Sequence, residues 1–173
     1  MDLVIKEYFN RYRKDGKLPP LIDGKVKGKL AAISLNLKFE VPDIDLKITG
    51  KLDDCLQLPD GSLIPLDHKT RASLPGDTSY SARYYQTQMD TYTLLLQKTG
   101  HKTTDEACII YYSPATGELH KGVPFEVEVH QLKTRPERAF ELYQQAKRCL
   151  EGALPDFNGS CEFCKWSREV ANQ

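Results

Sequence analysis

Hydrophobic and polar residues along the chain follow two periods, one typical of strands and one typical of helices. Segments with strand character lie at residues 34–40, 105–112 and 123–129. Segments with helical spacing of apolar residues lie at residues 2–14, 81–98 and 136–152. Residues 44–70 add two strand arms joined by a turn, so the order is helix, three strands, helix, two strands, helix. This order predicts an α/β sandwich with a mixed central sheet flanked by helices. A capping box, Thr134-Arg135-Pro136-Glu137, would begin the third helix.

The segment Gly50–Thr70 predicts a β-hairpin with acidic residues on both arms. Its turn at residues 59–62 contains Asp-Gly, which is a strong hairpin signal. If Asp-Gly forms a two-residue turn, Asp53 faces His68. A three-residue loop or a bulge would shift the register by one and place Asp53 opposite Asp67. In either register the two carboxylates come close, because directly opposed Cβ atoms lie about 5 Å apart.

Two carboxylates and one lysine therefore converge on one spot of the predicted sheet. Asp67 and Lys69 are two residues apart on a strand, so they share a face. The carboxylates of Asp53 and Asp67 repel at this distance, and a bound divalent cation removes the conflict. Mg²⁺ suits the pair because it is bound through one or two carboxylates and keeps several waters. The backbone carbonyl of His68 is a further predicted ligand. Such a cation activates water and polarises a phosphoryl oxygen, and Lys69 would orient the water or stabilise the transition-state charge.

The second predicted helix carries two polar side chains on its apolar face. Gln88 and Tyr92 are four residues apart and therefore neighbours. A buried amide and a buried phenol need hydrogen-bonding partners. Two interpretations remain open: the pair organises Lys69 or a substrate phosphate, or it is the polar edge of a core stripe.

In series, these residues resemble the RecB-like nucleases of the PD-(D/E)XK superfamily, which include CRISPR-associated exonucleases. The pattern is G-x-x-D, then (D/E)-x-K-T after a turn, then a helix with Q-x-x-x-Y; the matching residues are Gly50, Asp53, Asp67, Lys69, Thr70, Gln88 and Tyr92. The resemblance implies a restriction-endonuclease-like fold and Mg²⁺- or Mn²⁺-dependent hydrolysis of DNA. It further implies that Asp53 and Asp67 bind the metal, and that Lys69, Gln88 and Tyr92 complete the catalytic set.

Three positions carry alternatives. Asp54, rather than Asp53, is in phase with the apolar residues of its strand and is the alternative acid. Glu40 closes a predicted strand and is either an outer metal ligand or a surface charge. Fuller members of the family begin with a helix that brings a further acid or histidine to the metal, whereas the first histidine here is His68. We therefore expect the chain to be short at its N-terminus.

The charge of the chain is unevenly distributed. The formal net charge is zero, but residues 11–29 hold seven basic and two acidic residues, a balance of +5 that leaves −5 for the remainder. A basic segment beside an acidic metal site suits a phosphodiester substrate, although a solvated arm would look the same. The candidate DNA-binding residues are Arg11, Arg13, Lys14, Lys17, Lys25, Lys27 and Lys29.

The cysteines suggest a second, incomplete metal site. Cys161 and Cys164 form a C-x-x-C pair, which in a cytoplasmic chain suggests a metal or redox site. Some RecB-like nucleases hold a [4Fe-4S] cluster with one early and three late cysteines, but here no cysteine precedes Cys55 and none follows Cys164. A cluster and a closed zinc site each need four ligands. The pair is therefore a remnant, a half-site shared between chains, or part of a tail that packs through Phe163 and Trp166.

These observations predict one soluble chain of three parts: an N-terminal helix and basic loop (1–33), a nuclease core (34–154) and a tail with the C-x-x-C pair (155–173). No apolar run is long enough for a membrane span and no signal peptide is evident, so we expect a cytoplasmic protein. The main hypothesis is a metal-dependent DNA exonuclease, acting as a homo-oligomer or within a larger DNA-processing assembly. The alternatives are a catalytically incomplete nucleic-acid-binding module and a structural Fe–S or Zn protein.

Overall fold

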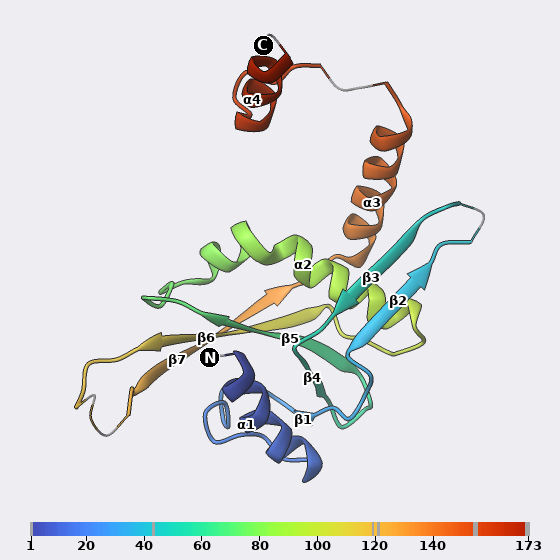
Figure 1. Ribbon diagram of the computed structural model, residues 1–173. Helices are drawn as coiled ribbons and strands as arrows, with labels where there is room; N and C mark the ends of the chain where they lie inside the picture. The colour runs from blue at the N-terminus through green and yellow to red at the C-terminus, as the bar shows by residue number, and fades with distance from the viewer. Residues whose placement is uncertain (1, 43, 119, 121, 154–155, 172–173) are drawn as a thin grey trace.

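A five-stranded mixed sheet forms the centre of the fold (Figure 1). The computed structural model describes residues 2–42, 44–118, 120, 122–153 and 156–171. In spatial order the strands are β1 (Lys29–Leu30), β4 (Asp54–Gln57), β5 (Leu63–Thr70), β6 (Glu106–Pro114) and β7 (Phe125–Lys133). The pair β5–β6 is parallel, and the other neighbours are antiparallel. The predicted α/β class with a mixed central sheet is confirmed.

Helices cover both faces of this sheet. Helix α1 (Asp2–Lys14) lies on one face, and α2 (Thr78–Lys98) lies on the other (Figure 1). Helix α2 is the crossover that the parallel strands β5 and β6 require. It begins at Asp77, whose carboxylate accepts a hydrogen bond from the Ser79 N–H at 2.7 Å, an N-cap that satisfies an unpaired amide of the first turn. Helix α3 (Pro136–Glu151) packs against α2.

Strand β5 is covered from both sides, and its composition reflects this. Its first five residues, Leu63 to Asp67, are all buried. A strand that is buried on both faces has a nearly continuous apolar sequence instead of an alternating one. Asp67 is a charged residue within this buried run, and its burial needs compensation from neighbouring groups.

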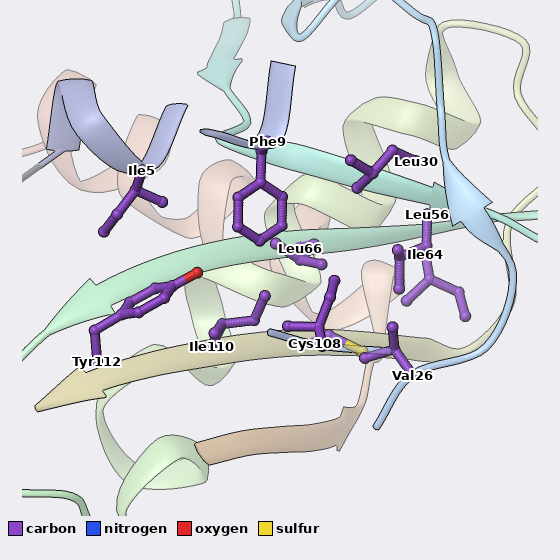
Figure 2. Packing of buried hydrophobic residues seen from close by; sticks show 11 residues of the cluster. Ile5, Phe9, Val26, Leu30, Leu56, Ile64, Leu66, Cys108, Ile110 and Tyr112 are labelled. Atoms are coloured by element: carbon purple, nitrogen blue, oxygen red, sulfur yellow. The ribbon is translucent and has the colours of Figure 1, made fainter. Parts of the chain in front are cut away.

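A cluster of buried apolar residues fills the space between α1 and the sheet. Figure 2 shows its residues in contact across the layer: Ile5, Phe9, Val26, Leu30, Leu56, Ile64, Leu66, Cys108, Ile110 and Tyr112. On the opposite face Met89 of α2 packs on Ile109 and Tyr111 of β6. Because each fully buried apolar side chain contributes about 1.5–3 kcal/mol, these two layers hold the sheet in place.

The arm predicted at residues 44–57 is not one strand. It divides into β3 (Lys47–Lys51), which pairs with β2 (Asn36–Glu40) in a separate two-stranded sheet, and β4 of the central sheet. The break falls at Leu52, whose side chain is 1% exposed and whose N–H bonds to the carbonyl of Leu35 at 2.8 Å. Burial of Leu52 in the core turns the chain, and the next residue is Asp53.

Residues 58–62 connect β4 and β5, and because Leu58 pairs with Ser62, the loop itself has three residues, 59–61. The two-residue turn is therefore wrong, and the shifted register is observed. The N–H of Leu58 bonds to the carbonyl of Ser62 at 2.9 Å, and the N–H of Gly61 bonds to the carbonyl of Leu58 at 3.0 Å. Gly61 has φ 83°, the left-handed conformation that closes such a loop.

The C-terminal part differs from expectation at two points. The capping box is wrong: Arg135 is the N-cap of α3 without a side-chain cap, and Thr134 Oγ1 is buried without a hydrogen-bond partner among the described residues. Helix α4 (Glu162–Ala171) lies beyond α3, away from the sheet (Figure 1). Phe163 and Trp166 are 83% and 64% exposed, so the alternative of a tail that packs through these two residues is not observed.

Among the helices of the described ranges, none combines the length and the hydropathy that crossing a lipid bilayer requires.

Candidate active site

The break between β3 and β4 brings two aspartates together. Asp54 pairs with Leu66 in the β4–β5 ladder, so the next position places Asp53 opposite Asp67. The carboxylate of Asp53 accepts a hydrogen bond from the His68 N–H at 3.1 Å. Its side chain is 22% exposed, whereas that of Asp67 is 2% exposed. The site therefore has a buried acid and a neighbouring acid that solvent can reach.

Asp67 is held by partners on both of its oxygens. The amide of Gln88 on α2 donates to Oδ1 at 2.9 Å, and the ammonium of Lys69 lies 2.5 Å from Oδ2. Burial raises the pKa of the Asp67 carboxyl, Lys69 opposes this effect, and the nearby Asp53 carboxylate raises the pKa further. The like charge of Asp53 therefore adds to the cost of ionising Asp67 in the buried site.

Gln88 is itself fixed through Tyr92. The Gln88 amide donates to the Tyr92 hydroxyl at 2.8 Å, and that hydroxyl donates to the carbonyl of Lys51 at 3.1 Å. The two polar residues of α2 thus connect the end of β3 with Asp67 on β5. This connection depends on close packing of α2 on β3. The packing is so close that a Cβ on Gly50 would lie 2.6 Å from Leu95 Cδ1. A side chain at position 50 would therefore force the buried side chain of Leu95 to move.

Lys69 lies between Asp67 and an aromatic ring. Its ammonium is 4.8 Å from the centroid of the Tyr85 ring on α2. This contact and the ion pair with Asp67 keep the charge of Lys69 at the site, since a cation is attracted to an aromatic face within about 6 Å.

The N-terminal helix adds a cation that the sequence did not reveal. The ammonium of Lys6 on α1 lies 3.4 Å from Asp53 Oδ1. Only the packing of α1 onto the sheet brings this residue to the hairpin, so no local pattern could have identified it. The site therefore combines the carboxylates of Asp53 and Asp67 with the ammonium groups of Lys6 and Lys69.

The two alternative acids, Asp54 and Glu40, are paired with other residues. Asp54 is 1% exposed and paired with Arg13 of α1 at 2.5 Å, and its Oδ1 accepts from the Cys55 N–H. Glu40 pairs with Lys47 in the β2–β3 ladder, at the end of that hairpin distant from Lys51, and forms an exposed ion pair with Lys38 at 2.5 Å. Asp54 is next to Asp53 in the chain, but its side chain is directed to Arg13, and Glu40 lies at the distant end of its hairpin.

The candidate DNA-binding residues have different environments. Arg13 forms the ion pair with Asp54 described above, and Lys25 donates to the carbonyl of Val127 at 2.9 Å. The others are exposed along α1, the following loop and β1: Arg11, Lys14, Lys17, Lys27 and Lys29.

The cysteine pair places two free thiols at the start of α4. Cys161 and Cys164 are partly exposed, and Cys149 is exposed on α3. Hydrogen bonds from the backbone of Cys164 and of Phe163 lower the pKa of the Cys161 thiol. In the described parts of the chain, no group of three or more His, Cys, Asp or Glu residues is arranged to hold a metal ion.

The Asp53–Asp67 pair nevertheless suits a magnesium-like ion. Such an ion is bound by one or two carboxylates and retains several waters, so it needs no third acidic ligand. Asp67 Oδ2 is buried beside the Lys69 ammonium, and the Asp53 carboxylate lies close enough to Asp67 to raise the pKa of its carboxyl. A cation between the two acids would remove their repulsion. The donor set therefore fits a hard divalent cation.

Comparisons with known proteins identify the family of the chain. No curated protein sequence matches the chain. Among solved structures, the crystal structure of SSO0001 is similar with 17% identity and a TM-score of 0.43, and the match covers 79% of this chain and 56% of that one. The chain thus spans little more than half the length of that protein. The family model described as the PD-(D/E)XK nuclease superfamily matches residues 20–168, which include the whole site around Asp53, Asp67 and Lys69. The chain therefore belongs to the PD-(D/E)XK nuclease superfamily.

Proposed function

We propose that this chain is a RecB-like nuclease that hydrolyses DNA phosphodiesters with Mg²⁺ or Mn²⁺ and acts as an exonuclease. The observation that carries the proposal is the meeting of Asp53 and Asp67 across the β4–β5 register, with Lys69 on the same face as Asp67. Membership of a nuclease superfamily supports the reaction class.

In this proposal Asp53 and Asp67, with the backbone carbonyl of His68, hold the divalent cation. When bound, such an ion polarises the phosphoryl group and lowers the pKa of the attacking water. Gln88 keeps Asp67 in one orientation through its 2.9 Å hydrogen bond, and Tyr92 keeps Gln88 in place. Groups that orient a ligand in this way are part of a metal site, because they fix the geometry of the ligand itself.

Lys69 supplies the positive charge of the protein at the reacting group. It lies between the Asp67 carboxylate and the Tyr85 ring, so its ammonium stays within reach of a phosphate at the two aspartates. A fixed cation at this place would stabilise the negative charge that develops in the transition state.

The test is cleavage of end-labelled linear DNA with Mg²⁺ or Mn²⁺, with and without chelator. We expect cleavage that chelator abolishes and that Asp67→Ala and Lys69→Ala each reduce by at least about 10²-fold. Asp60→Ala is the matched control, because Asp60 is an exposed acid in the loop of the same hairpin, paired with Lys102. Cleavage of linear DNA but not of closed circular DNA would identify an exonuclease. Activity that survives both site substitutions would exclude the proposal.

The alternative function is a nucleic-acid-binding module without hydrolysis, and Lys6 is the observation in its favour. Its ammonium lies 3.4 Å from Asp53 Oδ1, where it would compete with a metal ion for the carboxylate. Salt-dependent DNA binding without metal-dependent cleavage, in the parent protein and in Lys6→Ala, would select this alternative. Cleavage by the parent protein would exclude it.

A further inference from the structure

A row of aromatic rings leads from Lys69 of the candidate site to the protein surface. The ring of Tyr85 lies 4.8 Å from the Lys69 ammonium, and the ring centroid of Tyr80 lies 6.3 Å from that of Tyr85. The ring of Tyr84 follows, 4.6 Å from that of Tyr80. These tyrosines all belong to the first two turns of α2. The row therefore connects the site with the surface next to it.

Tyr84 is the exposed end of this row. It is 57% exposed, so its ring is accessible to a ligand from solvent. It precedes Gln88 by four residues, so the two side chains are neighbours on the helix, about 6 Å apart along its axis. Gln88 holds Asp67. The exposed ring is thus one helical turn from a residue that contacts the proposed metal ligand.

The ring of Tyr84 rests on a preformed base. Tyr80 and Tyr84 are tilted at 39° to each other. The guanidinium carbon of Arg71 lies 4.1 Å from the centroid of the Tyr80 ring, and Arg71 also hydrogen-bonds to the Tyr80 hydroxyl and to the carbonyl of Ser73. Arg71 follows the D-x-K-T segment by one residue, so the strand that carries Lys69 also fixes Tyr80.

The charges around the rings favour an anionic ligand. The guanidinium of Arg83 lies 5.4 Å from the Tyr84 ring, so two arginines and Lys69 accompany the aromatic row. The acids of the adjoining segments are engaged: Asp77 caps α2, and Glu128 contacts Gly76 and His130. Aromatic rings beside guanidinium groups are the combination that binds bases and phosphates of unpaired nucleic acid.

We propose that Tyr84, supported by Tyr80 and Arg71, is a stacking platform for an unpaired base next to the candidate site. This inference rests on the proposed nuclease function and names its substrate: a single strand, or the single-stranded end of a duplex. In closed duplex DNA each base is stacked between its neighbours, so no base face is available to Tyr84. Single-stranded DNA is the proposed ligand, because its unpaired bases can stack on the tyrosine rings and its phosphates can bind the neighbouring arginines and Lys69.

The test is the affinity of the Asp67→Asn protein for a fluorescently labelled oligothymidylate and for a labelled blunt duplex of two separate strands without a loop, measured in chelator by anisotropy. In this background Tyr84→Ala should weaken binding of the single strand by about 5- to 100-fold, since one base–aromatic stack contributes about 1–3 kcal/mol. Binding of the duplex should change by less than twofold. The matched control is Trp166→Ala, because Trp166 is an exposed aromatic residue on the distant helix α4.

A fluorescent reporter provides a second readout. Trp166 is the single tryptophan of the chain, so Tyr84→Trp combined with Trp166→Phe leaves one tryptophan, at the platform. Its fluorescence should be quenched on addition of oligothymidylate, and its affinity for the single strand should match that of Tyr84. Thermal unfolding of each variant checks that the fold is retained.

The outcomes separate the platform from the nuclease. Unchanged single-strand affinity in Tyr84→Ala, or equal losses for single strand and duplex, would overturn the platform even if the protein cuts DNA. A selective loss for the single strand would support the platform even if the parent protein cuts nothing. In that second case the hydrolysis fails and the binding site stands.

Discussion

Asp54 and Asp67 are buried to the same extent and paired in the same way, yet they lie in different environments. Each is 1% exposed, each has a cation at 2.5 Å, and burial raises the pKa of each carboxyl. They occupy opposite faces of the sheet: Asp54 faces α1 and Arg13, and Asp67 faces α2 and Gln88. A shifted pKa and an ion pair therefore do not by themselves identify an active site.

The difference lies in the groups around each pair. Arg13 and the Cys55 N–H contact the Asp54 carboxylate, so its charge is compensated by a guanidinium and by a backbone donor. The Asp53 carboxylate raises the pKa of both acids, but it lies across the ladder from Asp67, whose buried Oδ2 has the Lys69 ammonium as its cationic partner. Compensation within the protein is typical of a structural ion pair. A buried acid beside a second acid indicates a place for an external cation.

The largest expected effect is the loss of hydrolysis in Asp67→Asn. Replacement removes a proposed metal ligand and the partner of Lys69, so the rate should fall by about 10³-fold or more. The amide oxygen can still accept from Gln88, and one of two repelling charges disappears, so the metal-free fold should remain at least as stable. Rate and unfolding midpoint, measured on the same preparation, check both statements. A large loss of stability would make Asp67 a structural residue like Asp54.

The opposite result is expected for Asp54→Ala. Truncation leaves Arg13 partly buried without its carboxylate, and breaking such a pair costs about 3 kcal/mol of unfolding free energy. Urea unfolding measures this loss. Below the unfolding transition the rate of DNA cleavage should stay within about threefold of the parent, because the Asp54 side chain is paired with Arg13 and faces α1. A selective loss of rate without loss of stability would assign Asp54 to the active site and contradict the comparison.

A smaller effect is expected for Gln88→Ala, which tests whether the contacts of Asp67 matter for the reaction. Without the amide, Asp67 loses the donor at 2.9 Å and its link to Tyr92. Loss of a group that orients a metal ligand lowers metal affinity or activity by about 10- to 100-fold. Gln97→Ala is the matched control, since Gln97 lies on the same helix and bonds to Thr103 instead. Equal rates for both variants would exclude an orienting role for Gln88.

The sequence was sufficient for the parts of the fold that depend on local periodicity. The α/β class and the order of its main elements were predictable. The apolar pattern alone left Asp53 and Asp54 as alternative acids. The register of the β4–β5 hairpin could not be predicted, because the sequence is compatible with a two-residue and with a three-residue loop at Asp-Gly. These two loops differ by one position in strand pairing.

The contacts of α1 were beyond sequence reasoning for a physical reason. Lys6 and Arg13 lie 47 and 41 residues before the acids that they pair with, and only the docking of Ile5 and Phe9 into the core brings them there. The exposure of α4 could not be predicted for a related reason. Phe163 and Trp166 have the helical spacing of a packed face, but no described part of the core lies beside them.

The smallest predicted effect concerns pH and compares the same two aspartates. A raised pKa means that the folded state holds the proton more tightly than the unfolded state, whose aspartate pKa is about 3.9. Each group therefore makes the unfolding free energy fall as pH rises from about 4 through its raised pKa in the folded protein. Asp67→Asn and Asp54→Asn should each make this fall shallower, as urea unfolding in chelator at pH 4 to 7 would measure. Mg²⁺ should offset the fall in the parent and in Asp54→Asn, but not in Asp67→Asn, because only Asp67 belongs to the proposed metal site. Equal responses of both variants to Mg²⁺ would contradict the distinction between the two acids.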